Sequence, residues 1–138
     1  MLVQILEYAP FFLKHFIPRP PWWGGDLQTL RSYLRRPSPD LTPHAAETVE
    51  FTTADGSGDT LLATLNRPAA AAHRPLVVLI HGLTGCAEST YMLATARHLL
   101  DRGHPVLRLN LRGAGASRPR CRFQYHAGRS EDLRAVIG

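Results

Sequence analysis

Two short glycine-containing segments are the first candidates for chemistry in this chain. Residues 81–86 read His-Gly-Leu-Thr-Gly-Cys, and residues 112–117 read Arg-Gly-Ala-Gly-Ala-Ser. Glycine lets a backbone turn sharply and approach a ligand without a Cβ in the way. Such a segment could hold a phosphate group, or it could present a backbone N–H to an oxygen on which negative charge develops.

The second segment resembles the start of a dinucleotide-binding fingerprint, but the resemblance ends early. Arg118 stands where the third glycine should be, and Pro119 follows where a helix should begin. No helix N-terminus is then available for a pyrophosphate. The chain also has no G-x-x-x-x-G-K-[ST] phosphate-binding loop. We therefore expect no nucleotide cofactor.

The first segment is more specific. His81 and Gly82 directly follow an apolar run and precede a predicted helix, which is where α/β-type serine hydrolases place one N–H of the oxyanion hole. A donor already in place there lowers the barrier by about 3 kcal/mol. The predicted donor is the backbone N–H of Leu83, whose side chain would only line the pocket. An ordinary glycine-rich turn is the alternative.

Cysteine and histidine offer a second nucleophilic arrangement. Cys86 could act as a nucleophile with His81 or His126 as its base, although a small cysteine packed beside a glycine-rich turn is the simpler interpretation. Cys86 and Cys121 give no disulfide framework and, with the scattered histidines, no metal-ligand spacing. We expect no metal and a reducing, cytoplasmic location.

The basic net charge does not indicate a nucleic-acid partner. The chain carries a formal charge of +5, from 15 arginines and one lysine against 11 acidic residues. These arginines form no dense block, and no aromatic or helix-borne base readers accompany them. We interpret the arginine excess as codon bias and expect no nucleic-acid binding. With 44% hydrophobic and 20% charged residues, the composition is that of a globular domain.

Residues 1–25 are expected to lie outside the main domain. The apolar stretch 1–18 is interrupted by Glu7, Pro10 and Lys14, so it predicts neither a membrane-spanning helix nor a signal peptide. We expect an arm packed on the protein, with peripheral membrane contact as the alternative. A hinge rich in proline, tryptophan and glycine follows at 18–25, and a partial α/β domain at 26–138.

The elements that would position these segments follow from hydrophobic periodicity. Asp26 is the predicted N-cap of a helix with Leu27, Leu30 and Leu34 on one face. Alternating residues on both sides of the turn 55–58 predict a β-hairpin. Further on, the pattern predicts a strand at 76–80, a helix from Ser89 or Thr90 to Arg102, a strand at 106–111, a long loop through Gly128 and a helix capped by Ser130.

Four motifs follow one another along the chain. They are Leu27-Gln-Thr-Leu30, His81-Gly-Leu-Thr-Gly85 with Tyr91, Asn110-Leu-Arg-Gly113, and Tyr125-His-Ala-Gly128 before Glu131-Asp132. In this order they resemble the N-terminal half of the YheT-like esterases, a branch of the α/β-hydrolase superfamily. The resemblance covers the chain from about Trp22 to its end and departs at three positions. The family commonly has His where Asp26 stands, Glu where Thr84 stands and Ser where Cys86 stands.

This resemblance implies a fold and an activity. The fold class is α/β: the N-terminal part of a three-layer α/β-hydrolase sandwich, in which an antiparallel hairpin leads into a parallel sheet, truncated before the nucleophile strand. The implied activity is that of a Ser-His-Asp hydrolase of carboxylic esters, such as acylglycerols or phospholipids, which needs no cofactor. The implied site consists of the Leu83 donor, its loop support (His81, Gly82, Gly85) and residues that border the pocket or order the long loop (Arg112, Tyr125, His126), Arg112 by pairing with a carbonyl or carboxylate.

The serine elbow of that family is missing from these residues. No serine in the chain has glycine at both −2 and +2, so we expect residues 1–138 to be catalytically incompetent alone. The alternative is a non-catalytic interaction or scaffold module with the same fold. In the resembling sheet order, strand 76–80 would lie at an open edge, which predicts self-association.

Overall fold

The computed structural model describes residues 17, 19–34, 39–70 and 73–138. Contacts divide the chain into two compact units, Met1–Arg36 and Pro37–Gly138. The first contains helix α1 (Gly24–Leu34). Asp26 lies in the first turn of α1 and is not its N-cap, because the helix begins at Gly24, three residues before the predicted first helical residue, Leu27. Nearly all of the predicted arm 1–18 lies outside the described residues, and the boundary expected after residue 25 stays a prediction.

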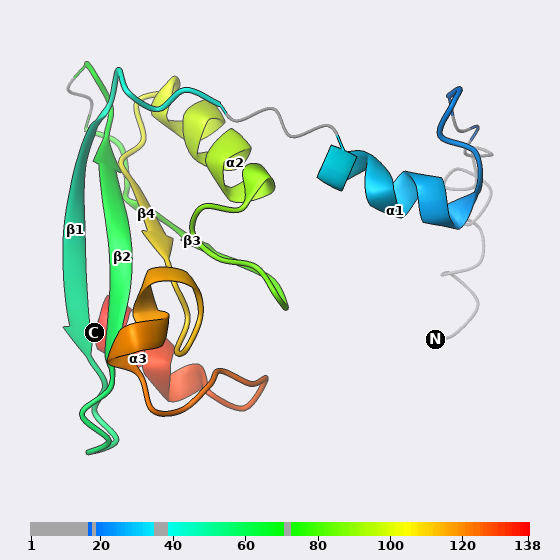
Figure 1. Cartoon of the computed structure of the whole chain (residues 1–138). Coiled ribbons are helices and arrows are strands. Elements are labelled where there is room, and N and C mark those ends of the chain that lie inside the picture. Colours follow the sequence, from blue (N-terminus) through cyan, green and yellow to red (C-terminus); the bar gives the residue numbers. More distant parts are fainter. Residues whose placement is uncertain (1–16, 18, 35–38, 71–72) are drawn as a thin grey trace, which may run out of the picture. The chain divides into compact units, whose positions relative to one another are not determined.

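The second unit contains a four-stranded mixed sheet. Its strands are β1 (Ala45–Thr52), β2 (Thr60–Arg67), β3 (Val77–Ile80) and β4 (Val106–Leu109), in the spatial order β1-β2-β4-β3 (Figure 1). β1 and β2 form the predicted antiparallel hairpin, β2 and β4 are also antiparallel, and β4 and β3 are parallel. The expected hairpin leading into a parallel sheet is confirmed.

Alternation along the strands builds a core on each face of the sheet. Leu61, Ala63, Leu107 and Leu109 form a buried cluster on one face. Val106, one position out of phase, belongs to a separate cluster on the other face. Side chains one residue apart on a strand point to opposite faces, so β4 contributes to both. All four residues of β4 are buried, as expected of a strand covered on both faces.

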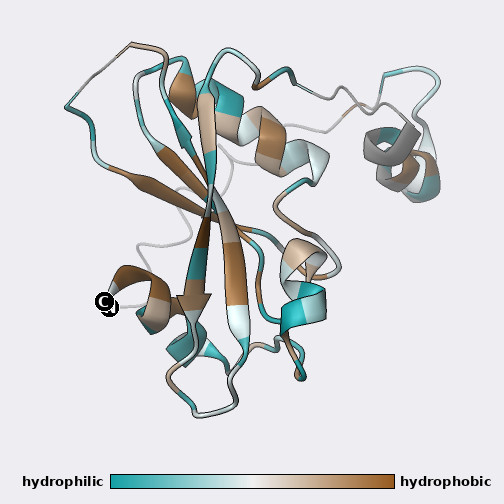
Figure 2. Ribbon diagram, turned by 60° about the vertical axis from the view of Figure 1, so that its left-hand side comes forward, coloured by the Kyte–Doolittle hydropathy of each residue, from teal (hydrophilic) through white to brown (hydrophobic). Residues whose placement is uncertain are grey.

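One helix covers each face, which makes three layers. Helix α2 (Thr90–Leu100) contributes Ala96 and Leu100 to the cluster around Val106. Helix α3 (Ser130–Ile137) contributes Leu133 and Val136 to the cluster on the opposite face. Hydrophobic residues colour much of the strands in Figure 2, whereas the connecting turns are mostly pale or teal.

Two details of the C-terminal part differ from the prediction. The loop after β4 contains a short 3-10 helix, η2 (Gly115–Arg120). The buried side chain of Ser117 explains why the chain turns into a helix here. Its hydroxyl donates to the Asn110 carbonyl at 3.0 Å and accepts a hydrogen bond at 2.8 Å from the amide of Leu62, which lies 55 residues away. Ser130 is the first residue of α3, and Arg129 occupies the N-cap position, so the predicted serine cap is wrong.

Candidate functional site

The loop after β3 makes a tight turn at residues 82–85. The Gly85 amide donates to the Gly82 carbonyl at 3.1 Å, and Thr84 adopts a left-handed conformation with φ of 61°. A positive φ at the third position of a four-residue turn is typical of type II geometry. A β-branched residue adopts it rarely, so the loop holds Thr84 in a strained conformation.

Three consecutive amides of this turn differ in their hydrogen bonds. The Gly82 amide donates to the Tyr91 hydroxyl at 2.8 Å, and the Thr84 amide donates to the Tyr125 hydroxyl at 2.8 Å. The Leu83 amide between them has no hydrogen-bond partner among the described residues. Leu83 is 85% exposed. The predicted oxyanion donor is therefore the one unoccupied N–H of the three.

His81 is buried and joins this turn to the end of β4. Its Nε2 accepts the Leu111 amide at 3.1 Å, and its Nδ1 lies 2.8 Å from the Gly82 carbonyl oxygen. Because a backbone N–H can only donate, Nε2 is the acceptor. Nδ1 therefore carries the ring proton and donates a hydrogen bond to the Gly82 carbonyl oxygen. Both ring nitrogens are thus used in holding the two loops together, and neither is free to act as a general base.

Two further residues of the predicted site, Tyr125 and His126, are neighbours in the loop that follows η2. Tyr125 packs edge-on against the His81 ring, with centroids 5.4 Å apart, and its amide donates to the Arg112 carbonyl at 2.9 Å. His126 is exposed, and its ring nitrogens lie 3.2 Å from the Gly128 amide nitrogen and 3.3 Å from Arg129 Nε. Tyr125 therefore contacts the turn, whereas the contacts of His126 stay within its own loop.

Cys86 is half-buried at the end of the same segment. Its amide donates to the Ser89 hydroxyl at 3.0 Å, and that hydroxyl lies 3.9 Å from its Sγ. In the described part of the chain, neither His81 nor His126 forms a hydrogen bond with Cys86. The geometry offers the thiol no base, so it favours the structural interpretation of Cys86.

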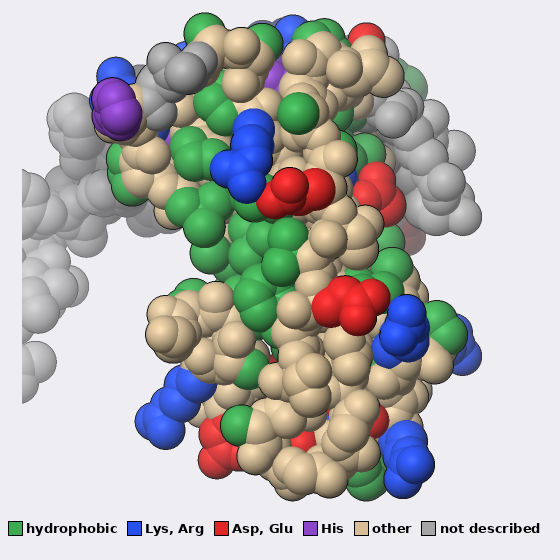
Figure 3. All heavy atoms as spheres, turned by 90° about the vertical axis from the view of Figure 1, so that its left-hand side faces the viewer, with side chains coloured by type: hydrophobic (Ala, Val, Ile, Leu, Met, Phe, Trp, Pro, Cys, Tyr) green, Lys and Arg blue, Asp and Glu red, His purple; other side chains and the backbone are tan. Residues whose placement is uncertain are grey.

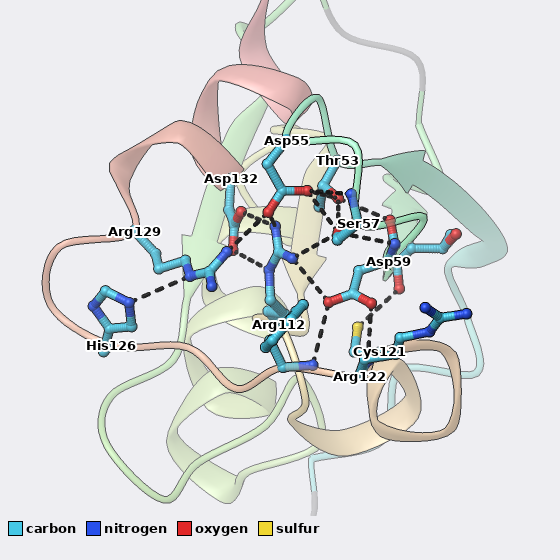
Figure 4. Close-up of polar contacts among 12 residues, drawn as sticks. Thr53, Asp55, Ser57, Asp59, Arg112, Cys121, Arg122, His126, Arg129 and Asp132 are labelled. Carbon is cyan, nitrogen blue, oxygen red and sulfur yellow. Dashed lines mark hydrogen bonds and ion pairs between the residues drawn. The ribbon is translucent and has the colours of Figure 1, made fainter.

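Arg112 lies completely buried at the centre of an ion-pair cluster (Figure 4). Its guanidinium donates to both carboxylate oxygens of Asp132, at 3.0 and 2.6 Å, and to Asp59 at 2.8 Å. Asp55 lies 3.0 Å from the same group. The predicted carboxylate partner of Arg112 is present three times over, from the hairpin turn and from α3. The cluster fastens the loop after β4 to both elements.

The cluster shifts the pKa values of Arg112, Asp59 and Asp55. The hydrogen bonds that Arg112 donates to Asp132 raise the pKa of its guanidinium above the ordinary value, although burial opposes the shift. Burial raises the pKa of Asp59, but hydrogen bonds from the Arg122 amide and from Arg112 outweigh burial, so the net shift is downward. Hydrogen bonds from Ser57 lower the pKa of Asp55 well below its usual range. All these groups are therefore charged at neutral pH.

Asn110 belongs to one of the sequence motifs, but the sequence analysis gave it no role. In the structure it holds two segments in position. Its side-chain oxygen accepts the Ala87 amide at 2.9 Å, which ties the segment before α2 to the end of β4. A Cβ on Gly115 would clash with this oxygen and would lie 2.8 Å from the Cβ of Cys86. The match at 110–113 signalled Asn110, but the contact itself joins residues 23 positions apart.

Neither a metal centre nor a membrane span is found in the described residues. These residues contain no group of three or more His, Cys, Asp or Glu side chains that could hold a metal ion. Over the same residues, every helix is too short or too polar to cross a bilayer.

Sequence comparisons place the chain among hydrolases. Residues 75–137 match the family described as the alpha/beta hydrolase fold. The chain is 31% identical over 117 residues to YheT of Escherichia coli, which is named as an esterase, and covers 33% of that protein. It is 32% identical over 117 residues to abhd-3.2 of Caenorhabditis elegans and covers 30% of it. The alignments cover 85% and 83% of this chain. The chain spans about a third of the length of these relatives.

Solved structures agree on the fold. A lidless α/β serine hydrolase from Xanthomonas campestris superposes with a TM-score of 0.54 at 25% identity, over 66% of this chain and 42% of that one. An α/β serine hydrolase homologue from Coxiella burnetii gives a TM-score of 0.50 at 24% identity, over 66% and 43%, and shows the fold alone. By family match, sequence relatives and fold, the chain is similar to the α/β-hydrolase superfamily and to its YheT-like branch.

Proposed function

We propose that this chain supplies the oxyanion-hole loop of a serine hydrolase that acts on carboxylic esters. One observation carries the proposal: the Leu83 amide has no hydrogen-bond partner in the part of the chain that the structure describes, while the amides on both sides of it each donate to a tyrosine hydroxyl. An N–H that is fixed and unoccupied before the reaction stabilises the oxyanion of the tetrahedral intermediate without reorganisation. The esterase name of the YheT relative supports the ester as substrate.

The chemistry would proceed through an acyl-enzyme. A serine hydroxyl attacks the ester carbonyl while a histidine takes its proton, and the alcohol leaves with that proton. Water then attacks the acyl-serine in the same way and releases the carboxylic acid. Since no serine here has glycine at both −2 and +2, we propose that residues 1–138 alone do not turn over esters. Lipid esters remain a proposal that follows from the resemblance, and a cytoplasmic location remains one that follows from the cysteine usage.

The test is hydrolysis of p-nitrophenyl esters by the complete product of the gene that encodes these residues. Leu83→Pro removes the N–H, and proline is common at the second position of a type II turn, so the turn should survive. We expect Leu83→Pro to lower kcat by about 10²- to 10³-fold. The matched control, Leu83→Ala, keeps the amide and should stay close to wild type.

Two outcomes would contradict the proposal. A complete product that carries a serine elbow but hydrolyses none of these esters would refute the assigned activity. Burst release of p-nitrophenol by residues 1–138, abolished by Cys86→Ala, would instead make Cys86 a nucleophile and remove the need for a serine.

The non-catalytic interaction module stays a second candidate because of β3. Within the described residues β3 pairs with β4 alone, so its other edge presents unpaired backbone groups that could accept a strand. We propose that residues 1–138 self-associate through this edge. A scaffold role would require this association to persist in the complete gene product, which sedimentation of that product measures.

A further inference from the structure

The two tyrosines at the 82–85 turn come from separate elements and meet the same short segment. Tyr91 lies in the first turn of α2, and Tyr125 lies in the loop that follows η2. Each hydroxyl oxygen is 2.8 Å from an amide nitrogen of the turn, Tyr91 from Gly82 and Tyr125 from Thr84. The peptide groups that precede and follow the Gly82–Leu83 peptide are therefore each held by a tyrosine, and the Leu83 N–H belongs to the peptide between them.

Core packing does not account for this arrangement. Tyr91 is 52% exposed, so its ring contributes little to the interior, and its hydroxyl could bind water instead. Gly85 makes room for it, because a Cβ at that position would lie 2.7 Å from the Tyr91 hydroxyl oxygen and 3.1 Å from the Gly82 carbonyl oxygen. The loop is built to let this hydroxyl approach the backbone.

The contacts also explain how Thr84 keeps its left-handed conformation. A threonine with φ of 61° persists only where surrounding contacts determine the backbone. The Tyr125 hydroxyl binds the Thr84 amide on one side, and the Gly85–Gly82 hydrogen bond closes the turn on the other. Without the tyrosine contacts on the two neighbouring peptides, the Gly82–Leu83 peptide could rotate and turn the Leu83 N–H away.

We propose that Tyr91 and Tyr125 are positioning residues that fix the direction of the Leu83 amide. The inference rests on the proposed oxyanion role of Leu83 and adds the residues that set its geometry. Neither tyrosine need touch the reacting atoms, because each acts through a backbone hydrogen bond. Electrostatic stabilisation of an oxyanion depends on the donor being oriented beforehand, so loss of either hydroxyl should reduce the rate and leave substrate binding nearly unchanged.

Hydrogen exchange at single-residue resolution tests the geometry on the 138-residue chain. In the wild type, the Gly82 and Thr84 amides should exchange slowly and the Leu83 amide fast. Tyr91→Phe should accelerate exchange of the Gly82 amide, and Tyr125→Phe should accelerate exchange of the Thr84 amide, each by about tenfold for the loss of one hydrogen bond. Phenylalanine keeps the ring, so protection of the β4 amides should not change. Slow exchange at Leu83, or unchanged exchange at both neighbours, would overturn the inference.

Kinetics on the complete gene product test the consequence. Each Phe variant should lower kcat about tenfold with KM little changed, and neither should lower it further in a Leu83→Pro background, because the oriented donor is then absent. Tyr33→Phe, the same substitution in the first compact unit, is the matched control. If the wild type is active and both Phe variants keep its kcat, the inference fails while the function stands. If the wild type is inactive, the function fails and the exchange result still decides the geometry.

Discussion

At the level of single residues, Arg112 is the most informative side chain. It is completely buried and lies between Asp55, Asp59 and Asp132. The planar guanidinium has five donors in a fixed fork, which suits several carboxylates at once. We expected Arg112 to pair with a carbonyl or a carboxylate, and its three carboxylate partners lie 20 to 57 positions away. No local pattern connects them.

Removing the charge of Arg112 should strongly destabilise the second unit. Arg112→Met leaves buried carboxylates without their cation, which costs about 3–5 kcal/mol. Arg67→Met is the matched control, because its pair with Glu47 is exposed, with 58% and 53% of the side chains accessible, and should contribute at most about 1 kcal/mol. Urea unfolding measures both. Equal losses would contradict the central role of Arg112, and Arg112→Lys, which keeps the charge but not the fork, should fall between them.

The same cluster predicts that stability depends on pH. The pKa values of Asp55 and Asp59 are lower in the folded state than in the unfolded chain, so the unfolded state takes up protons first. Their contribution is complete above the unfolded value of about 3.9 and is lost as the pH falls toward the folded values.

The urea midpoint should therefore decrease as the pH is lowered from 5 to 2.5 in a titration run at constant ionic strength. Asp59→Asn should be less stable at neutral pH and should show a shallower decrease on acidification. A wild-type urea midpoint that stays constant over this pH range would show that the folded state does not favour the ionised form of these carboxylates.

At the level of elements, the loop between β4 and α3 depends on one glycine contact. Gly113 has φ of 71°, and a Cβ there would lie 2.8 Å from the Phe123 carbonyl oxygen. Gly56, in the hairpin turn, has a similar φ of 74° but open space around it. The two glycines share the conformational requirement and differ only in the close approach of another segment.

Gly113→Ala should therefore destabilise the protein more than Gly56→Ala. Both substitutions place alanine in a left-handed conformation at about 1–2 kcal/mol, and only the first also pushes residues 123–124 away from the loop. We expect a further 1–3 kcal/mol, the usual range for overpacking, measured by urea unfolding. Equal effects of the two substitutions would show that the loop accommodates a Cβ freely.

Hydrophobic periodicity predicted the elements better than their ends. The hairpin, β3, α2, β4 and α3 all appear where the pattern indicated. The cap residues Asp26 and Ser130 were wrong, because each lies inside its helix. Helix η2 was missed because its position depends on the bonds of Ser117 to Asn110 and Leu62, and not on any period in the sequence.

At the level of the whole molecule, the two edges of the sheet differ in chemistry. On edge strand β1, Glu47 and Glu50 pair with Arg67 and Arg120, and charged side chains disfavour edge-to-edge association. From the β1 side, Figure 3 shows hydrophobic side chains gathered in a strip that acidic and basic side chains flank. Edge strand β3 (Val77–Ile80) consists of four apolar residues.

The β3 edge should drive self-association of residues 1–138. Leu76, which directly precedes β3, and Ile80, its last residue, are 51% and 44% exposed, and a lysine at either position should weaken strand pairing. Sedimentation velocity should show oligomers for the wild type and a smaller average mass for Leu76→Lys and Ile80→Lys. Leu83→Lys, at an exposed position outside the strand, is the control. A wild type that sediments as a monomer at every concentration would contradict this prediction.

The sequence by itself indicated the resemblance to α/β hydrolases, the order of the elements and the candidate donor Leu83, because strand alternation, helical spacing and short motifs are local properties. Tertiary structure alone decided that the Leu83 amide has no partner among the described residues while Tyr91 and Tyr125 bind its neighbours, and that Arg112 meets three carboxylates. These contacts join residues that lie far apart in the chain, and only packing of the strands and helices around both faces of the sheet brings them within hydrogen-bonding distance.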